Sequence, residues 1–305
     1  MTLLAGRYRL DQLIARGGMA TVHQADDEVL RRPVAVKTPT PDRATDTAFR
    51  KAVRHEAVAA ASLSHPNIAR LFDYGEAEWQ GVLQPFLVME LVAGTTVAAH
   101  LAEHGPMEWR EAAEICAGVA AGLTAAHHKE LVHCDVKPSN IMMSPGKVKI
   151  LDFGVSARSG QRPADPYGRV WGTPAYLAPE QMHGQPATPA SDMYALGLVL
   201  HACLTGRQPW PGKGAYQVLT ARACKPVPQL PDVTKVPEAL IRIHRTCLDR
   251  SPKKRPSAHQ VARLLTDVVN GRPHLRQATV RRNLETLTAR LTPWALSRDR
   301  VPETR

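Results

Sequence analysis

The 305-residue sequence is poor in cysteine and in aromatic residues, and it contains no long apolar run. Its five cysteines are never closer than 18 residues, so neither the paired spacing of a zinc site nor a disulfide framework is visible. No stretch reaches the roughly 18 apolar residues that a membrane span needs, and residues 1–10 lack the charged-then-apolar order of a signal peptide. We therefore expect a protein of the reducing cytoplasm without a transmembrane segment.

Acidic residues are also scarce, because 28 Asp and Glu stand against 39 Lys and Arg, which gives a formal charge of +11. Such a charge favours acidic partners such as nucleotides, nucleic acid or anionic membranes. Residues 270–305 carry eight Arg against three acidic residues, a net +5, so almost half of the excess lies in this tail. Leu284, Leu287 and Leu291 follow helical spacing there. A basic amphipathic helix is one interpretation, with packing on the rest of the chain, disorder, or contact with a membrane surface, a regulator or nucleic acid all open.

What is present divides the chain into a strand-rich and a helical part. With 44% hydrophobic residues the bulk of the chain should fold. Apolar periodicity in the first part predicts strands over residues 8–15, 22–26, 34–36, 68–74 and 82–91, and a helix over 47–63. Beyond Thr95 the pattern predicts helices over 109–129, 191–205, 215–223, 237–248 and 257–269, and a small hairpin within 131–157. A break at Gly94 separates the two parts.

Polar residues suited to catalysis follow one another in a definite order along the chain. Phosphoryl transfer needs phosphates held in place, metal ions that bridge them and a carboxylate that orients the attacking hydroxyl. The matching features are a glycine turn at Gly17-Gly18, a lysine after an apolar strand, a glutamate on the next helix, and a polar loop over residues 133–140. That loop holds a carboxylate, a cation two residues later and an amide five residues later, and Asp152-Phe153-Gly154 follows. It is the most specific signal in the sequence.

The motifs and their order resemble those of the eukaryotic-type (Hanks-type) Ser/Thr protein kinases. Their residues are most similar to those of bacterial, particularly actinobacterial, members. The resemblance covers about residues 7–269. It implies an α+β class, two-lobed protein kinase fold, with a β-rich N-lobe over 1–92, a helical C-lobe over 93–270 and a basic tail over 271–305. It also implies transfer of the γ-phosphate of ATP, with Mg²⁺ or alternatively Mn²⁺, to Ser or Thr of protein substrates and of the chain itself. No nucleic-acid partner is expected.

The resemblance assigns roles to individual residues. Asp135 is implied to orient the substrate hydroxyl, Lys137 to neutralise charge on the moving phosphoryl group, and Thr173 to bond both and favour Ser/Thr acceptors. Asn140 and Asp152 are implied to bind the metal. The positions implied to hold ATP are Ile14, Gly17, Gly18, Val22, Ala35, Lys37, Glu56, Met89, Glu90, Val92 and Met142.

Within that set, Lys37 is implied to hold the α- and β-phosphates and Glu56 to orient it, since an unpaired lysine beside apolar strand residues would be costly. Met89 corresponds to the family's gatekeeper. The implied adenine contacts are the side chains of Val22 and Ala35 and the backbones of Glu90 and Val92.

Two departures from the family pattern bear on activity. Ala15 and Ala20 occupy the places of the first and third glycines of the nucleotide loop, but Gly17-Gly18 still lets backbone N–H groups approach phosphate, so we expect ATP binding to survive. Cys134 stands where many regulated kinases carry an arginine that pairs with a phosphorylated activation loop. Residues 155–172 offer only Ser156, Ser159 and Tyr167 as acceptors. We therefore predict a non-RD kinase whose activity does not require loop phosphorylation; Cys134 is either a packing residue or a redox-sensitive thiol.

Residues 172–180 resemble the family's substrate-docking segment. Glu180 in it is expected to pair with Arg255, and Asp192 to brace the catalytic loop. This segment favours a protein kinase over a small-molecule phosphotransferase, which would not need it. The main alternative is a pseudokinase, an ATP-binding scaffold without transfer, but such a protein usually lacks Lys37, Asp135, Asn140 or Asp152, and all four are present here.

Overall fold

The computed structural model describes residues 3–17, 20–40, 47–79, 81–152, 157–158, 173–210, 212, 214–224, 229–230 and 235–272. Several residues that the sequence analysis singled out lie outside this set: Gly18, Phe153, Gly154, Ser156, Ser159, Tyr167, Gly172 and the tail beyond Arg272, together with the side chain of Glu56.

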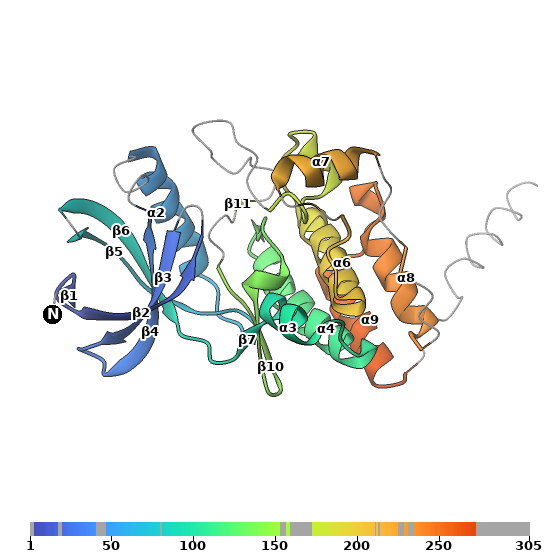
Figure 1. Cartoon of the computed structure of the whole chain (residues 1–305), viewed down its shortest axis with the longest axis horizontal. Coiled ribbons are helices and arrows are strands. Elements are labelled where there is room, and N and C mark those ends of the chain that lie inside the picture. Colours follow the sequence, from blue (N-terminus) through green and yellow to red (C-terminus); the bar gives the residue numbers. More distant parts are fainter. Residues whose placement is uncertain are drawn as a thin grey trace, which may run out of the picture.

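The N-terminal part is a six-stranded antiparallel sheet with one helix beside it (Figure 1). The strand order is β1-β2-β3-β4-β6-β5. β-branched and aromatic side chains from neighbouring strands, Val34, Val36, Phe86 and Val88, form a buried cluster with Tyr8 on one face. The elements are β1 (Leu3–Leu4), β2 (Tyr8–Arg16), β3 (Ala20–Asp27), β4 (Arg32–Pro39), β5 (Leu71–Trp79), β6 (Val82–Glu90) and helix α2 (Thr47–Ala61).

The predicted strands of this part form, with one correction. The strand predicted from residue 68 begins at Leu71 instead. Ile68 makes an isolated parallel bridge to Ile150 and is buried in the core of the helical part. Its apolar side chain therefore serves the second core, which an apolar run cannot reveal because burial against a sheet and burial against a helix give the same pattern.

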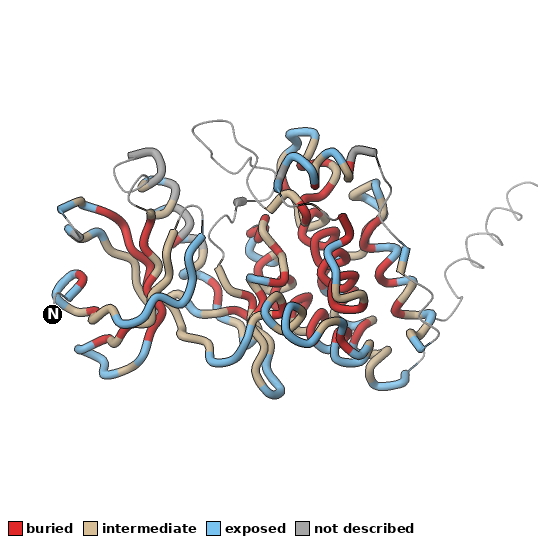
Figure 2. Tube along the Cα trace, in the orientation of Figure 1, coloured by how far each residue is buried: buried red, intermediate tan, exposed pale blue. Residues whose placement is uncertain are grey.

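The C-terminal part is helical, and Figure 2 shows its buried residues gathered around α6. Every residue of α6 from Ser191 to Leu204 is buried, which fits a helix that is apolar on most of its surface. α4 packs against both α6 and α9. The helices are α3 (Val97–His104), α4 (Trp109–His127), α5 (Pro179–Met182), α6 (Pro189–Thr205), α7 (Ala215–Cys224), α8 (Glu238–Cys247) and α9 (Ala258–Val269).

Short strands flank the polar loops where the N-terminal sheet meets the helical part. β9 (Ile141–Ser144) pairs with β10 (Lys147–Ile150) as the predicted hairpin and with β7 (Thr95–Thr96). β8 (Leu131–Val132) pairs with β11 (Ala157–Arg158). Gly94 enters β7 with φ +127°, and a Cβ there would lie 1.9 Å from the carbonyl oxygen of Met143. Only glycine fits this crossing between the two parts. No described helix is long and apolar enough to cross a membrane.

Candidate active site

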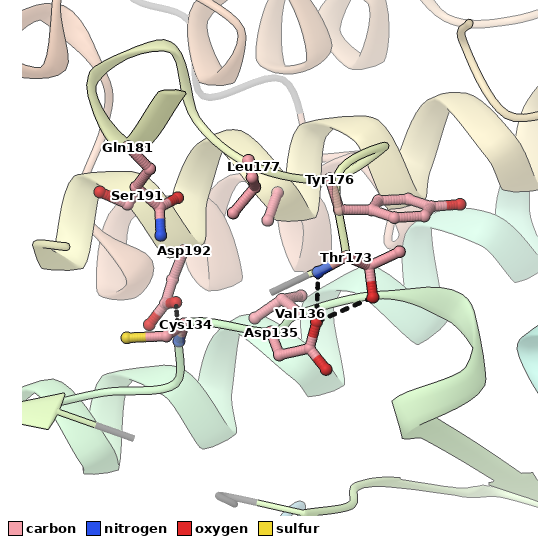
Figure 3. Close-up of a pocket in the computed structure, with 10 residues that line it drawn as sticks. Cys134, Asp135, Val136, Thr173, Tyr176, Leu177, Gln181, Ser191 and Asp192 are labelled. Carbon is pink, nitrogen blue, oxygen red and sulfur yellow. Dashed lines mark hydrogen bonds between the residues drawn. The ribbon is translucent and has the colours of Figure 1, made fainter. Parts of the chain in front are cut away.

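Asp135 is the centre of a cluster of side chains in the loop between β8 and β9 (Figure 3). Its Oδ1 accepts hydrogen bonds from the backbone N–H of Thr173 at 3.0 Å and from the Thr173 hydroxyl at 3.1 Å. Its Oδ2 lies 2.6 Å from Lys137 Nζ and accepts a bond from Asn140 Nδ2 at 3.1 Å. Lys137 also donates to Thr173 Oγ1 at 2.8 Å. Four of the predicted site residues thus meet at one carboxylate.

Asp192 of α6 bonds to the backbone of this loop. Its carboxylate accepts the backbone N–H groups of His133 at 2.9 Å and Cys134 at 3.0 Å, and it contacts His127 Nε2 at 2.8 Å. Asp192 is 1% exposed, so these bonds form away from water and are correspondingly strong. Cys134 adopts φ +66°, a left-handed conformation that costs a non-glycine residue energy. The predicted brace therefore exists, and it holds a strained backbone in place.

Two histidines that the sequence analysis left without a role complete the support. The His133 ring accepts the Asp135 N–H at Nδ1, 3.2 Å away, so its Nε2 carries the proton and donates to the carbonyl of Leu151 at 3.1 Å. His133 therefore connects the Asp135 loop to the residue before Asp152. The only sequence signal for this supporting role of His133 was its place in the 133–140 motif. The sequence contained no signal for the contact of His127 with Asp192.

Lys37 and Asp152 form the second cluster. Lys37 Nζ on β4 lies 2.5 Å from Asp152 Oδ1, which brings together residues that are 115 positions apart. Burial favours a raised pKa for the Asp152 carboxyl, but the Lys37 ammonium outweighs it and the net pKa is lowered, so the carboxylate is charged at neutral pH. The predicted Lys37–Glu56 pair falls outside the described side chains.

The predicted adenine and nucleotide-loop residues lie on strands around the sheet's inner end. Strand register sets Ala35 opposite Met89 and Val22 opposite Lys37. Gly17 closes the β2–β3 turn by donating its N–H to the Ala20 carbonyl at 2.8 Å. The remaining predicted nucleotide residues are Ile14 near the end of β2, Glu90 at the end of β6, Val92 after that strand, and Met142 on β9. Among the described residues, no hydrogen bond joins them to the Asp135 or Asp152 clusters.

The donor set fits a hard cation such as Mg²⁺. Asn140 uses both bonds of its Nδ2 on Asp135, to the backbone carbonyl and to Oδ2, so its Oδ1 is the atom left for a metal. The other ligand would be Asp152, the next motif residue after Asn140, whose carboxylate is charged. Among the described residues no group of three or more His, Cys, Asp or Glu could hold a metal alone. Few protein ligands, supplemented by phosphate oxygens, are what Mg²⁺ takes in nucleotide sites.

The segment after Thr173 borders the Asp135 cluster and encloses a small pocket with it (Figure 3). The predicted Glu180–Arg255 pair anchors this segment, with two nitrogen–oxygen contacts of 2.7 and 2.8 Å between buried side chains. Burial alone would raise the pKa of Glu180, but the bonds from Arg255 and Ser191 lower it. The pocket-lining residues include Cys134, Val136, Tyr176, Leu177 and Gln181.

Comparison with known proteins agrees with this geometry. The family model described as protein kinase domain matches residues 8–264. The chain belongs to the protein kinase family. Among curated relatives, it is 43% identical over 230 residues to the serine/threonine-protein kinase PknA of Mycobacterium tuberculosis, covering 75% of this chain and 53% of the relative. It is 39% identical over 266 residues to PksC of Streptomyces coelicolor, covering 84% and 48%.

A third kinase relative, PrkC of Bacillus subtilis, is 38% identical over 216 residues, covering 70% of this chain and 33% of the relative. All three are named as serine/threonine-protein kinases. The chain therefore spans about half or less of the length of these kinases, and the similarity concerns the part that carries the kinase domain match.

Proposed function

We propose that this chain is an ATP-dependent Ser/Thr protein kinase. The observation that carries the proposal is the triad at Asp135, where one carboxylate is bonded by both the backbone and the hydroxyl of Thr173 while Lys137 bridges the other oxygen to that hydroxyl. A carboxylate held in this way between a lysine and a docking segment suits the orientation of a substrate hydroxyl. The relatives' names support Ser and Thr as acceptors.

In the proposed reaction the substrate hydroxyl oxygen bonds to the γ-phosphorus of ATP as the bond from that phosphorus to the β–γ bridging oxygen breaks and ADP leaves. Asp135 receives the hydroxyl proton, and Lys137 balances negative charge on the moving phosphoryl group. Lys37 contacts the phosphates of ATP. Mg²⁺, when bound, neutralises phosphate charge, and Asn140 Oδ1 with the Asp152 carboxylate would hold it.

We also propose that activity does not depend on phosphorylation of the activation loop. Cys134, next to Asp135, is 7% exposed and packs with Val132 and Ala187, and a cysteine cannot carry the positive charge with which an arginine there would bind a phosphate. This burial supports the packing interpretation of Cys134 over the redox one. The proposal also includes autophosphorylation and a boundary between the two lobes at residues 92–93. It further includes a cytoplasmic location and weak contact of the basic tail with a membrane surface.

The test is transfer of radiolabelled phosphate from ATP with Mg²⁺ to the protein itself and to a generic basic protein. Asp135→Asn keeps the shape of the side chain and removes its charge, so we expect label on Ser and Thr in the wild type and at least a hundredfold less in the variant. Asp26→Asn, a carboxylate change on the surface of β3, is the control and should retain transfer. Equal labelling by wild type and Asp135→Asn would refute the proposed role of Asp135.

A pseudokinase scaffold is the second candidate, favoured by Ala15 and Ala20 in the nucleotide turn. It predicts ATP binding, seen as a rise in melting temperature with ATP and Mg²⁺, without any transfer.

The independence of activity from activation-loop phosphorylation has its own test. Replacing Ser156, Ser159 and Tyr167 with Ala, Ala and Phe should leave transfer intact. Activity that appears only after phosphorylation of one of these residues would contradict the loop-independent proposal.

A further inference from the structure

Arg222 of α7 reaches the docking segment beside the Asp135 cluster. Its two terminal guanidinium nitrogens donate hydrogen bonds to the backbone carbonyls of Pro174 and Leu177. These carbonyls are three residues apart: Pro174 lies within the turn that the Tyr176 N–H closes on the Thr173 carbonyl at 2.8 Å, and Leu177 directly follows it. One rigid, planar side chain therefore fixes the separation of these two carbonyls.

The surroundings of Arg222 are unusual for a cation. The side chain is 8% exposed, and its guanidinium lies over the ring of Trp210, 4.5 Å from the centroid. Among the residues that the structure describes, no carboxylate pairs with it, and burial lowers its pKa. A buried charge whose partners are carbonyl dipoles, the side chain of Tyr194 and an aromatic face is costly, and an apolar side chain of similar size would often be at least as stable. A gain in the free energy of folding therefore does not explain why an arginine occupies position 222.

Side-chain hydrogen bonds hold the docking segment near its two ends, and Arg222 adds bonds between them. At its start, Thr173 is bonded to Asp135. At its end, Glu180 is paired with Arg255. Between these anchors the chain has no strand or helix to define its shape, since α5 begins only at Pro179. The turn bond of Tyr176, the buried side chains of Ala175 and Leu177 and the two carbonyl bonds from α7 together hold residues 174–177.

We propose that Arg222 is a positioning residue for the protein substrate: it fixes the docking segment so that an acceptor hydroxyl reaches Asp135. The inference rests on the proposed kinase function. Arg222 touches neither ATP nor the reacting atoms, and it acts through the backbone of Pro174 and Leu177. Its loss should weaken recognition of protein substrates and leave ATP recognition unchanged.

The experiment compares the wild type with Arg222→Met and Arg222→Lys. The first removes both bonds; the second keeps the charge but cannot span two carbonyls with a planar fork. Arg242→Met on the exposed face of α8 is the matched control. Steady-state kinetics with a Ser-containing protein substrate should show its KM raised about tenfold in Arg222→Met and less in Arg222→Lys, as expected for lost charge-assisted bonds, while the KM for ATP stays constant.

A second readout follows hydrogen–deuterium exchange of the backbone amides at 175–178, which should be faster in both Arg222 variants than in Arg242→Met. An unchanged protein KM in both Arg222 variants would overturn the inference, as would a parallel rise of both KM values. Failure of the wild type itself to transfer phosphate would defeat the proposed function instead. In that case unaltered exchange at 175–178 would still overturn the positioning role, and faster exchange there would support it.

Discussion

Lys149 of β10 and Glu90 at the end of β6 form an ion pair, with Lys149 Nζ 3.0 Å from Glu90 Oε2. The same carboxylate oxygen accepts the backbone N–H of Arg70 at 3.2 Å, and Lys149 also donates to the Ile68 carbonyl at 3.4 Å. The pair therefore ties the hairpin of the helical part to the strand from which the chain leaves the sheet. Sequence analysis gave Glu90 a backbone role only and Lys149 none.

This pair should position the backbone that the proposed function assigns to adenine binding. Both side chains are partly buried, so loss of the pair should cost about 1 kcal/mol, which corresponds to roughly a fivefold change in binding. We expect Lys149→Met and Glu90→Gln each to raise the KM for ATP by about that factor, with kcat changed less. Lys147→Met on the exposed end of the same strand is the control. Wild-type ATP affinity in both variants, measured by titration calorimetry, would show that the pair is only structural.

Local spacing explains what the sequence predicted well, and long-range contact explains what it missed. The contacts among Asp135, Lys137 and Asn140 join residues that are at most five positions apart in one loop. The bonds of Arg222 and Lys149 join segments that are 45 and 59 residues apart, and side-chain periodicity carries no information about such partners. Helix α3 was missed because it is short, although Thr96 caps it by accepting the Ala99 N–H.

The brace at Asp192 should control the catalytic loop more than ATP binding. Asp192→Asn replaces one acceptor oxygen with a donor, so one of the three groups that it contacts loses its partner. Such a loss costs about 1–3 kcal/mol, and the strained φ of Cys134 is then less constrained. We expect kcat to fall at least tenfold in a phosphate-transfer assay, with little change in the KM for ATP. A folded variant with wild-type kcat would show that the loop holds its shape without Asp192.

The buried Glu180–Arg255 pair should stabilise the fold cooperatively. Arg255→Met leaves a buried carboxylate without its cation, which costs about 3–5 kcal/mol, and Glu180→Gln leaves a buried guanidinium. Because Ser191 also donates to Glu180 Oε1 at 2.8 Å, part of the network survives each single change. Each single change leaves one buried charge without its partner, whereas the double variant leaves none. The double variant should therefore lose less free energy of unfolding than the two single losses added. Denaturant unfolding of all four proteins measures this, and strict additivity would mean that the two side chains are independent.

His201 of α6 and His244 of α8 stack in the helical core with ring centroids 5.4 Å apart. Both are buried, and the described structure gives no hydrogen-bond partner to His201 Nδ1 or to His244 Nε2. Burial lowers the pKa of His201 to about 4 and that of His244 to about 3, with the charges of His201 and Arg245 adding to the effect on His244. The pair is therefore neutral in the folded protein across the physiological pH range.

This pair should make the fold sensitive to mild acid. In the unfolded chain both imidazoles take up protons near their ordinary pKa of about 6.5, while the folded chain resists protonation, so the unfolded state binds more protons as the pH falls. The stability is fully present above pH 6.5 and declines below it, by about 2 kcal/mol per histidine at pH 5. Denaturant unfolding between pH 7 and 5 should show this slope in the wild type and in exposed His259→Phe. In the double variant His201→Phe/His244→Phe the slope should largely disappear, because no buried imidazole remains; an equal slope there would assign the acid sensitivity to other groups.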